Sequence, residues 1–141
     1  MLENFIKNRI IQALPFIPNE GQAELLQILT QFILSKNKQK GFVLRGYAGT
    51  GKTSIMAALV KALSELKQPV VLLAPTGRAA KVLARYANKA AYTIHKYIYR
   101  QDKLGTESFS LSDNLHKHTI FIIDEASMLD ISLTYHLLKA V

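Results

Sequence analysis

The hydrophobic pattern predicts helices interrupted by short strands. Apolar residues recur three and four positions apart in residues 2–14 and again after Asn19, which indicates two amphipathic helices. Pro15 ends the first helix, Pro18 closes an extended link, and Asn19 has the position of an N-cap. Helical spacing returns in three later segments: residues 55–63, residues 79–86 with Ala79, Val82, Leu83 and Tyr86 apolar, and residues 131–138.

Three short apolar runs have the length and composition of strands: Phe42–Arg45, Val70–Ala74 and Thr119–Ile123. Because these runs are continuous rather than alternating, they indicate a parallel sheet covered by helices on both faces. We therefore predict an α/β fold, a three-layer sandwich with a parallel sheet in the middle. Residues 99–118 are polar and follow neither pattern.

Composition narrows the class of protein. The 141 residues, 49% of them hydrophobic, suit one compact domain, and the absence of cysteine excludes disulfides and thiolate metal sites. A net charge of +8 favours a polyanionic partner. His116 and His118 lack a third ligand and are interpreted as solvated loop residues. No apolar run reaches membrane-spanning length and no secretory signal is present, so we expect a cytoplasmic protein without a membrane partner.

A glycine-rich segment between a predicted strand and a predicted helix carries the first chemistry. It reads Gly46-Tyr47-Ala48-Gly49-Thr50-Gly51-Lys52-Thr53, the pattern of a phosphate-binding loop. Glycines let backbone N–H groups approach phosphate oxygens, Lys52 reaches the β- and γ-phosphates, and the Thr53 hydroxyl faces Mg²⁺. The cofactors predicted are therefore ATP and Mg²⁺, with a binding set of Gly46, Ala48, Gly49, Thr50, Gly51, Lys52, Thr53 and Ser54.

Asp124 and Glu125 form the second group of candidate functional residues. They follow four apolar residues, which puts both carboxylates at the C-terminal end of a strand, where open α/β sheets bind ligands. Asp124 is predicted to hold Mg²⁺ and Glu125 to polarise the attacking water, so that Lys52 and Glu125 are the catalytic candidates. An ordinary acidic strand-to-loop junction is the alternative, and the phosphate-binding loop argues against it.

Four segments in order extend this pattern: Gly46–Thr53, Ala74–Lys81, Thr93–His95 and Asp124–Asp130. Together they resemble superfamily 1 DNA helicases of the RecD-like and Dda-like branch, from Asn19 to Leu138. The resemblance implies a partial RecA-like motor domain over residues 19–141, preceded by a helix and linker at residues 1–18. In this truncated RecA-like sandwich, the strand Phe42–Arg45 would lie next to the strand that ends at Asp124. It also implies an ATP-dependent DNA helicase that moves on single-stranded DNA with 5′-to-3′ polarity, and a small hairpin inserted at about residues 99–118.

The same resemblance assigns roles outside the phosphate loop. Gln22 matches a glutamine that contacts adenine, although Asn19 and Gln22 also have the spacing of a capping box. In the family, one segment lies against single-stranded DNA, and the residues that match it here are Thr76, Gly77, Arg78 and Lys81. His95 matches the next family segment on the DNA side. Arg78, Lys81 and Arg85 share one helix face, and the alternative interpretation is a solvated basic face without a DNA partner. For His95 the alternative is a structural role. Around the hairpin, Tyr97, Tyr99 and Phe109 could stack on bases or pack on the core.

The sequence also departs from the family. The family continues after the acid pair with a Gly-Asp-x-x-Gln segment and a second RecA-like domain that completes the ATP site, and neither precedes Val141. We therefore expect the N-terminal piece of a larger helicase, with slow ATP hydrolysis alone and an open sheet edge that could support self-association. Three alternatives remain: a non-translocating P-loop ATPase or kinase, a nucleic-acid-binding module, and a subunit of a DNA repair or recombination exonuclease complex.

Overall fold

The computed structural model describes residues 2–35, 40–46, 51–97 and 119–129, together with residues 132, 134 and 137. The chain divides into two compact units, Met1–Glu65 and Leu66–Val141, and each is described by itself. The inserted hairpin predicted at about residues 99–118 lies outside the described residues. No described helix is both long and apolar enough to cross a membrane.

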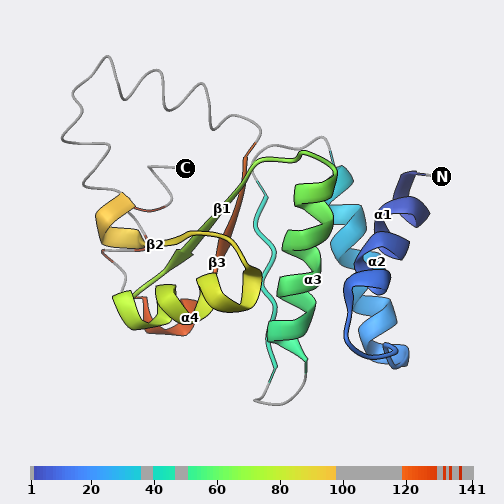
Figure 1. Cartoon of the computed structure of the whole chain (residues 1–141), viewed down its shortest axis with the longest axis horizontal. Helices are drawn as coiled ribbons and strands as arrows, with labels where there is room; N and C mark the ends of the chain where they lie inside the picture. Colours follow the sequence, from blue (N-terminus) through green and yellow to red (C-terminus); the bar gives the residue numbers. More distant parts are fainter. Residues whose placement is uncertain are drawn as a thin grey trace. The chain divides into compact units, whose positions relative to one another are not determined.

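The first unit contains three helices, α1 (Leu2–Ala13), α2 (Glu20–Leu34) and α3 (Lys52–Glu65) (Figure 1). Helix α1 packs against both α2 and α3. Ile6 and Ile10 of α1 are buried, as are Leu26 and Leu29 of α2. The helices predicted in these regions are confirmed. An exposed ion pair joins Arg9 to Glu65 at 3.1 Å, and a pair this accessible adds little stability.

A capping box starts α2. The Asn19 side chain accepts a hydrogen bond from the backbone N–H of Gln22 at 2.8 Å, and the Gln22 side chain accepts one from the backbone N–H of Asn19 at 2.9 Å. Two N–H groups that the helix itself leaves unpaired are thereby satisfied. The predicted N-cap at Asn19 is confirmed, and the orientation of Gln22 is set by it.

The second unit is built on a three-stranded parallel sheet in the order β2-β1-β3. Strand β1 (Val70–Ala74) is followed by helix α4 (Gly77–Ala87) and strand β2 (Ala91–Thr93), and strand β3 (Ile120–Ile123) leads into a short 3₁₀ turn, η1 (Ala126–Met128). Leu72 is in register with Ala91 on one side and with Ile122 on the other. The predicted α/β class and its parallel sheet are confirmed.

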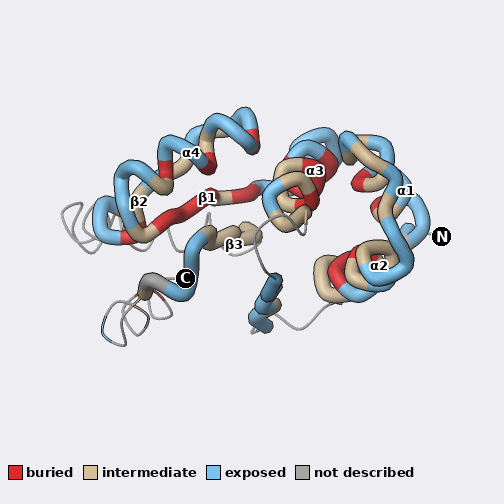
Figure 2. The backbone as a smooth tube through the Cα atoms, turned by 90° about the horizontal axis from the view of Figure 1, so that it is seen from below, coloured by how far each residue is buried: buried red, intermediate tan, exposed pale blue. Residues whose placement is uncertain are grey.

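Strand β1 is the buried centre of this unit, and Figure 2 shows it buried over most of its length. Leu73 of β1 forms a core cluster with Ile94 and Leu137. Tyr97 packs on this cluster and meets the Phe121 ring edge-on, with centroids 6.0 Å apart. Burial raises the pKa of the Tyr97 hydroxyl above its usual value. Of the two roles predicted for Tyr97, packing on the core is the one observed.

The strand predicted at Phe42–Arg45 is not formed. Val43 is 77% exposed, and the Phe42 ring instead packs on Phe32 of α2 at a centroid distance of 5.5 Å. A strand requires a hydrogen-bonded neighbour, and none of the described residues pairs with this segment. In the sheet as described, β2 and β3 are the outer strands, and self-association through an open edge stays a prediction.

The apolar stripe predicted on the helix after Thr76 is also partly wrong. Val82 and Tyr86 are exposed, whereas the buried positions of α4 are Ala80, Leu83 and Ala87. Small alanines let α4 lie close to β1 and β2, which it contacts. The prediction is therefore right for Leu83 and wrong for Val82 and Tyr86.

Candidate functional site

The N-terminus of α3 begins within the phosphate-loop motif. Lys52 is the first residue of the helix, and the backbone N–H of Ile55 donates to the carbonyl oxygen of Gly51 at 2.9 Å. The N–H groups of this first turn and the positive end of the helix dipole suit an anion such as a phosphate. Of the predicted binding set, Gly46 and residues 51–54 are described; Ala48, Gly49 and Thr50 lie outside the described residues.

The Lys52 side chain reaches back to the first glycine of the motif, and its Nζ donates a hydrogen bond to the carbonyl oxygen of Gly46. The ammonium is thus held between the first glycine of the motif and the helix that follows it. Thr53 is exposed at the same helix end and Ser54 is half-buried. A hydroxyl oxygen at Thr53 and a carboxylate at Asp124 are ligands that suit Mg²⁺.

Gly51 has a structural reason to be glycine. Its φ is +90°, and a Cβ placed there would lie 3.0 Å from Gln22 Nε2 and 3.1 Å from Phe16 Cζ. The side chains of Phe16 and Gln22 therefore occupy the space beside the loop that a larger residue would need. The sequence pattern places Phe16 in the extended link before Asn19 and predicts no contact for it. The feature that could have indicated a packed side chain is a bulky aromatic residue between two prolines.

This contact bears on the two roles predicted for Gln22. The capping box is present, and the amide nitrogen of the same side chain lies beside Gly51 at the phosphate loop. The cap is observed, and the adenine contact stays a prediction.

In the second unit, the parallel sheet brings three separate segments to one edge. Ala74 is in register with Thr93, and the backbone N–H of Asp124 donates to the carbonyl oxygen of Leu73 at 3.0 Å. The carboxyl ends of β1, β2 and β3 are therefore neighbours. Thr93 is the last residue of β2, Asp124 directly follows β3, and Thr76 lies two residues after β1. Ligands of open α/β sheets bind at this kind of edge.

The acid pair has an unusual backbone. Asp124 Oδ1 accepts a hydrogen bond from the backbone N–H of Glu125 at 3.0 Å, and Glu125 has a left-handed conformation with φ 55° and ψ 41°. Such a conformation is uncommon for a residue with a Cβ. It turns the chain sharply at the end of β3 and leaves the Glu125 side chain exposed.

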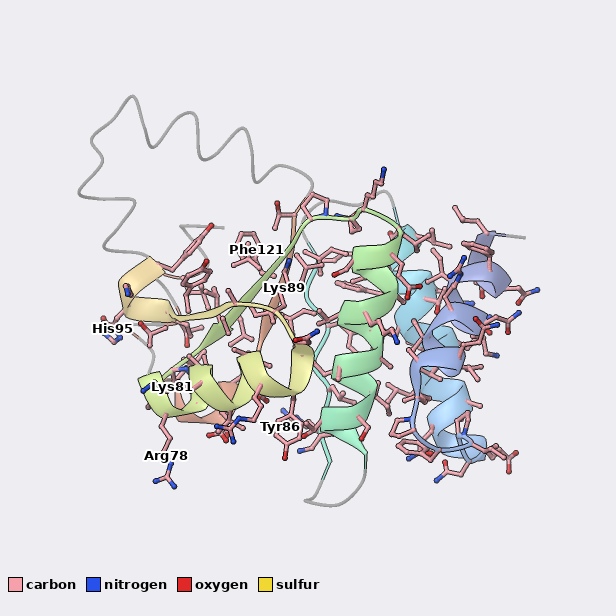
Figure 3. All side chains as sticks on the ribbon, viewed as in Figure 1. Arg78, Lys81, Tyr86, Lys89, His95 and Phe121 are labelled. Carbon is pink, nitrogen blue, oxygen red and sulfur yellow. The ribbon has the colours of Figure 1, made fainter. Side chains whose placement is uncertain are left out.

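The segment predicted to face DNA starts with a helix cap. Thr76 Oγ1 accepts a hydrogen bond from the backbone N–H of Ala79 at 3.1 Å, and the carbonyl oxygen of Thr76 accepts one from Ala80 at 2.9 Å. A Cβ on Gly77 would meet nothing within 4 Å, so space beside this residue is open. Arg78 and Lys81 are exposed, and Figure 3 shows Arg78 extending away from α4.

The segment after β2 is capped in the same way. Thr93 Oγ1 accepts a hydrogen bond from the backbone N–H of Lys96 at 3.1 Å, and residues 94–97 form a helical turn. Ile94 points into the core, whereas the His95 side chain is exposed. The second unit thus brings together Thr76, Thr93 and Asp124, while Lys52 and Thr53 belong to the first. The shared Mg²⁺ site of Thr53 and Asp124 stays a prediction.

The chain is similar to a protein family and to several known proteins. The model of the family described as AAA domain matches residues 18–141. The ATP-dependent DNA helicase dda of Enterobacteria phage T4 is 34% identical over 129 residues, which cover 86% of this chain and 28% of that helicase. The ATP-dependent RecD2 DNA helicase of Deinococcus radiodurans is 33% identical over 105 residues, covering 70% of this chain and 13% of RecD2.

A further relative is the RecBCD enzyme subunit RecD of Buchnera aphidicola, which is 31% identical over 119 residues, covering 69% of this chain and 19% of the subunit. The chain therefore corresponds to less than a third of each of these proteins. No solved structure matches it.

The first test concerns Gly51. We expect Gly51→Ala to lower the free energy of unfolding by about 1–3 kcal/mol, because alanine is strained at positive φ and its Cβ would press on Phe16 and Gln22. Gly77→Ala is the matched control, since its Cβ enters open space at the start of a helix and should cost nothing. Urea denaturation measures both. Equal effects of the two substitutions would contradict the account of Gly51.

The second test concerns Glu125. Replacing it with glycine should raise the free energy of unfolding by about 1 kcal/mol, because glycine adopts the left-handed conformation without the steric cost of a Cβ. Glu125→Ala keeps that cost and should leave stability nearly unchanged. Thermal melts of the three proteins at one pH compare them. A less stable glycine variant would show that the Glu125 side chain stabilises the turn.

Proposed function

Since the chain belongs to the AAA domain family and has relatives among the RecD- and Dda-like helicases of superfamily 1, we propose that it is the ATP-binding N-terminal part of an ATP-dependent DNA helicase. In this proposal, hydrolysis of ATP drives movement along single-stranded DNA, with 5′-to-3′ polarity. A second RecA-like domain of the same protein would complete the ATP site.

The observation that carries the proposal is the row of Thr76, Thr93 and Asp124 along one sheet edge. A nucleotide-hydrolysing site needs only the acid pair there. The two capped turns beside it, with exposed Arg78 and His95, supply hydrogen-bond donors and positive charge for a second anionic ligand. This combination favours a DNA-dependent motor over a P-loop ATPase or kinase that does not translocate.

In the nucleotide site, the N–H groups at the start of α3 and the Lys52 ammonium would bind the phosphates. Lys52 already donates to the Gly46 carbonyl, so it would exchange a neutral acceptor for an anionic one. Thr53 and Asp124 would hold Mg²⁺, which neutralises charge on the phosphates. Glu125 would orient the attacking water and accept its proton, and Gln22 would contact the adenine edge.

In the DNA site, Thr76 and Gly77 would allow the backbone of a single strand to approach the start of α4, where Arg78 and Lys81 meet its phosphates. The open space beside Gly77 supports such an approach. His95 would contact the strand from the neighbouring turn. Because one relative is a subunit of the RecBCD enzyme, the second candidate function is that of a subunit in a DNA repair or recombination exonuclease complex.

ATP binding tests the nucleotide half of the proposal. Lys52→Ala should weaken ATP binding by about 1.5–3 kcal/mol, the usual contribution of a hydrogen bond to a charged group. Titration calorimetry in Mg²⁺ measures it. The matched control is Lys61→Ala, which removes an exposed lysine from the same helix, α3, and should leave the affinity unchanged. Equal affinities for the Lys52 variant and the wild type would overturn the assignment.

Salt-dependent DNA binding tests the other half. Arg78→Ala should weaken binding to oligothymidylate and flatten the slope of log affinity against log salt by about 0.7, the effect of one lost phosphate contact on a single strand. Fluorescence anisotropy over a salt series gives the slope. The matched control is Lys61→Ala, which also removes one positive charge but from α3 and not from α4. If both substitutions act alike, only net charge attracts the DNA and the assignment fails.

A further inference from the structure

The outward side of α4 carries a surface that extends beyond the proposed DNA site, which uses Arg78 and Lys81 near the start of the helix. Arg78, Val82 and Tyr86 are four residues apart and form one row along the helix, and Lys81 and Arg85 form the row beside it. Val82 is 43% exposed and Tyr86 is 60% exposed. The opposite side of the helix is the buried one, so these two apolar side chains do not contribute to the core.

The segment that contains this apolar pair carries charge of one sign. Residues 66–97 contain six lysines and arginines and no aspartate or glutamate. Among the residues that the structure describes, no acidic side chain forms an ion pair with Arg78, Lys81 or Arg85. A row of such cations beside exposed apolar side chains is complementary to a ligand that is both acidic and apolar.

Val82, Arg85 and Tyr86 lie farther along the helix than the DNA site, and Lys81 borders both surfaces. Helix α4 starts at the carboxyl edge of the sheet and Tyr86 is nine residues beyond Gly77, which is about 14 Å at 1.5 Å per residue. Figure 3 shows Arg78 and Tyr86 extending from the same side of α4, near its opposite ends. Tyrosine alone could stack on a base, but an aliphatic neighbour such as Val82 suits the side chain of a protein better.

We infer that the outward surface of α4 formed by Val82, Arg85 and Tyr86, with Lys81 at its side, docks an acidic segment of a partner protein. Apolar side chains of that segment rest on Val82 and Tyr86, and its carboxylates pair with Lys81 and Arg85. Apolar contact at the centre with charged pairs at the rim is the usual arrangement of a protein interface. This role adds to the proposed motor function and does not depend on ATP.

A labelled peptide tests the inference on the whole chain. The probe is a short fluorescein-labelled peptide in which aspartates alternate with phenylalanines, followed by fluorescence anisotropy. Tyr86→Ser and Arg85→Glu should each weaken its binding at least about tenfold, whereas Tyr86→Phe should retain it. Lys61→Glu makes the same charge reversal as Arg85→Glu on α3 and should have a much smaller effect. Unchanged ATP affinity shows that the Tyr86→Ser protein is folded.

Control peptides separate the two parts of the surface. Exchanging aspartate for lysine in the peptide should abolish binding, and exchanging phenylalanine for serine should weaken it to the level of the Tyr86→Ser protein. The inference is overturned if the acidic peptide does not bind the wild type, or if Lys61→Glu and Arg85→Glu act equally. It is also overturned if Tyr86→Ser weakens oligothymidylate binding as strongly as peptide binding, because the occupant would then be nucleic acid.

Discussion

The backbone pairing of β1 with a parallel neighbour on each side is the constraint on which the second unit depends. Residues of β1 are in register with β2 on one side and β3 on the other, and nearly all of its side chains are buried. Parallel strands end at the same edge, so each chain segment that leaves the sheet starts there. Thr76, Thr93 and Asp124 come from three distant parts of the sequence, and this pairing is what makes them neighbours.

A second constraint operates at Gly51 in the first unit. The positive φ of this glycine opens the turn into α3, and the space beside it is filled by Phe16 and Gln22. The link before α2 is therefore part of the phosphate-loop structure. Gln22 also completes the cap of α2, because its side-chain oxygen accepts the hydrogen bond from the backbone N–H of Asn19. The same side chain thus takes part in the cap of α2 and lies beside Gly51, where its Nε2 atom would be 3.0 Å from an added Cβ.

Much of this arrangement could be predicted from the sequence, and the predictions that were wrong failed for physical reasons. Asn19, the strand Val70–Ala74 and the helix after Lys52 follow from local chemistry: a capping residue, a continuous apolar run and a glycine loop before a helical stripe. The Phe42–Arg45 strand failed because apolar residues favour a strand only where a partner strand is available. Phe16 was missed because its contact with Gly51 spans 35 positions, and no spacing rule reaches that far.

Glu125 shows how local conformation can serve the chemistry proposed for it. Its left-handed backbone costs about 1 kcal/mol or more for a residue with a Cβ, and the hydrogen bond from its N–H to Asp124 Oδ1 helps to hold it. A relaxed backbone at this position would carry the chain onward from β3 in another direction. The strained turn instead sets two adjacent carboxylates differently, with Asp124 half-buried and tied to the turn and Glu125 exposed. A carboxylate fixed by a hydrogen bond and an exposed carboxylate next to it would suit the separate roles in metal binding and water activation that we propose for them.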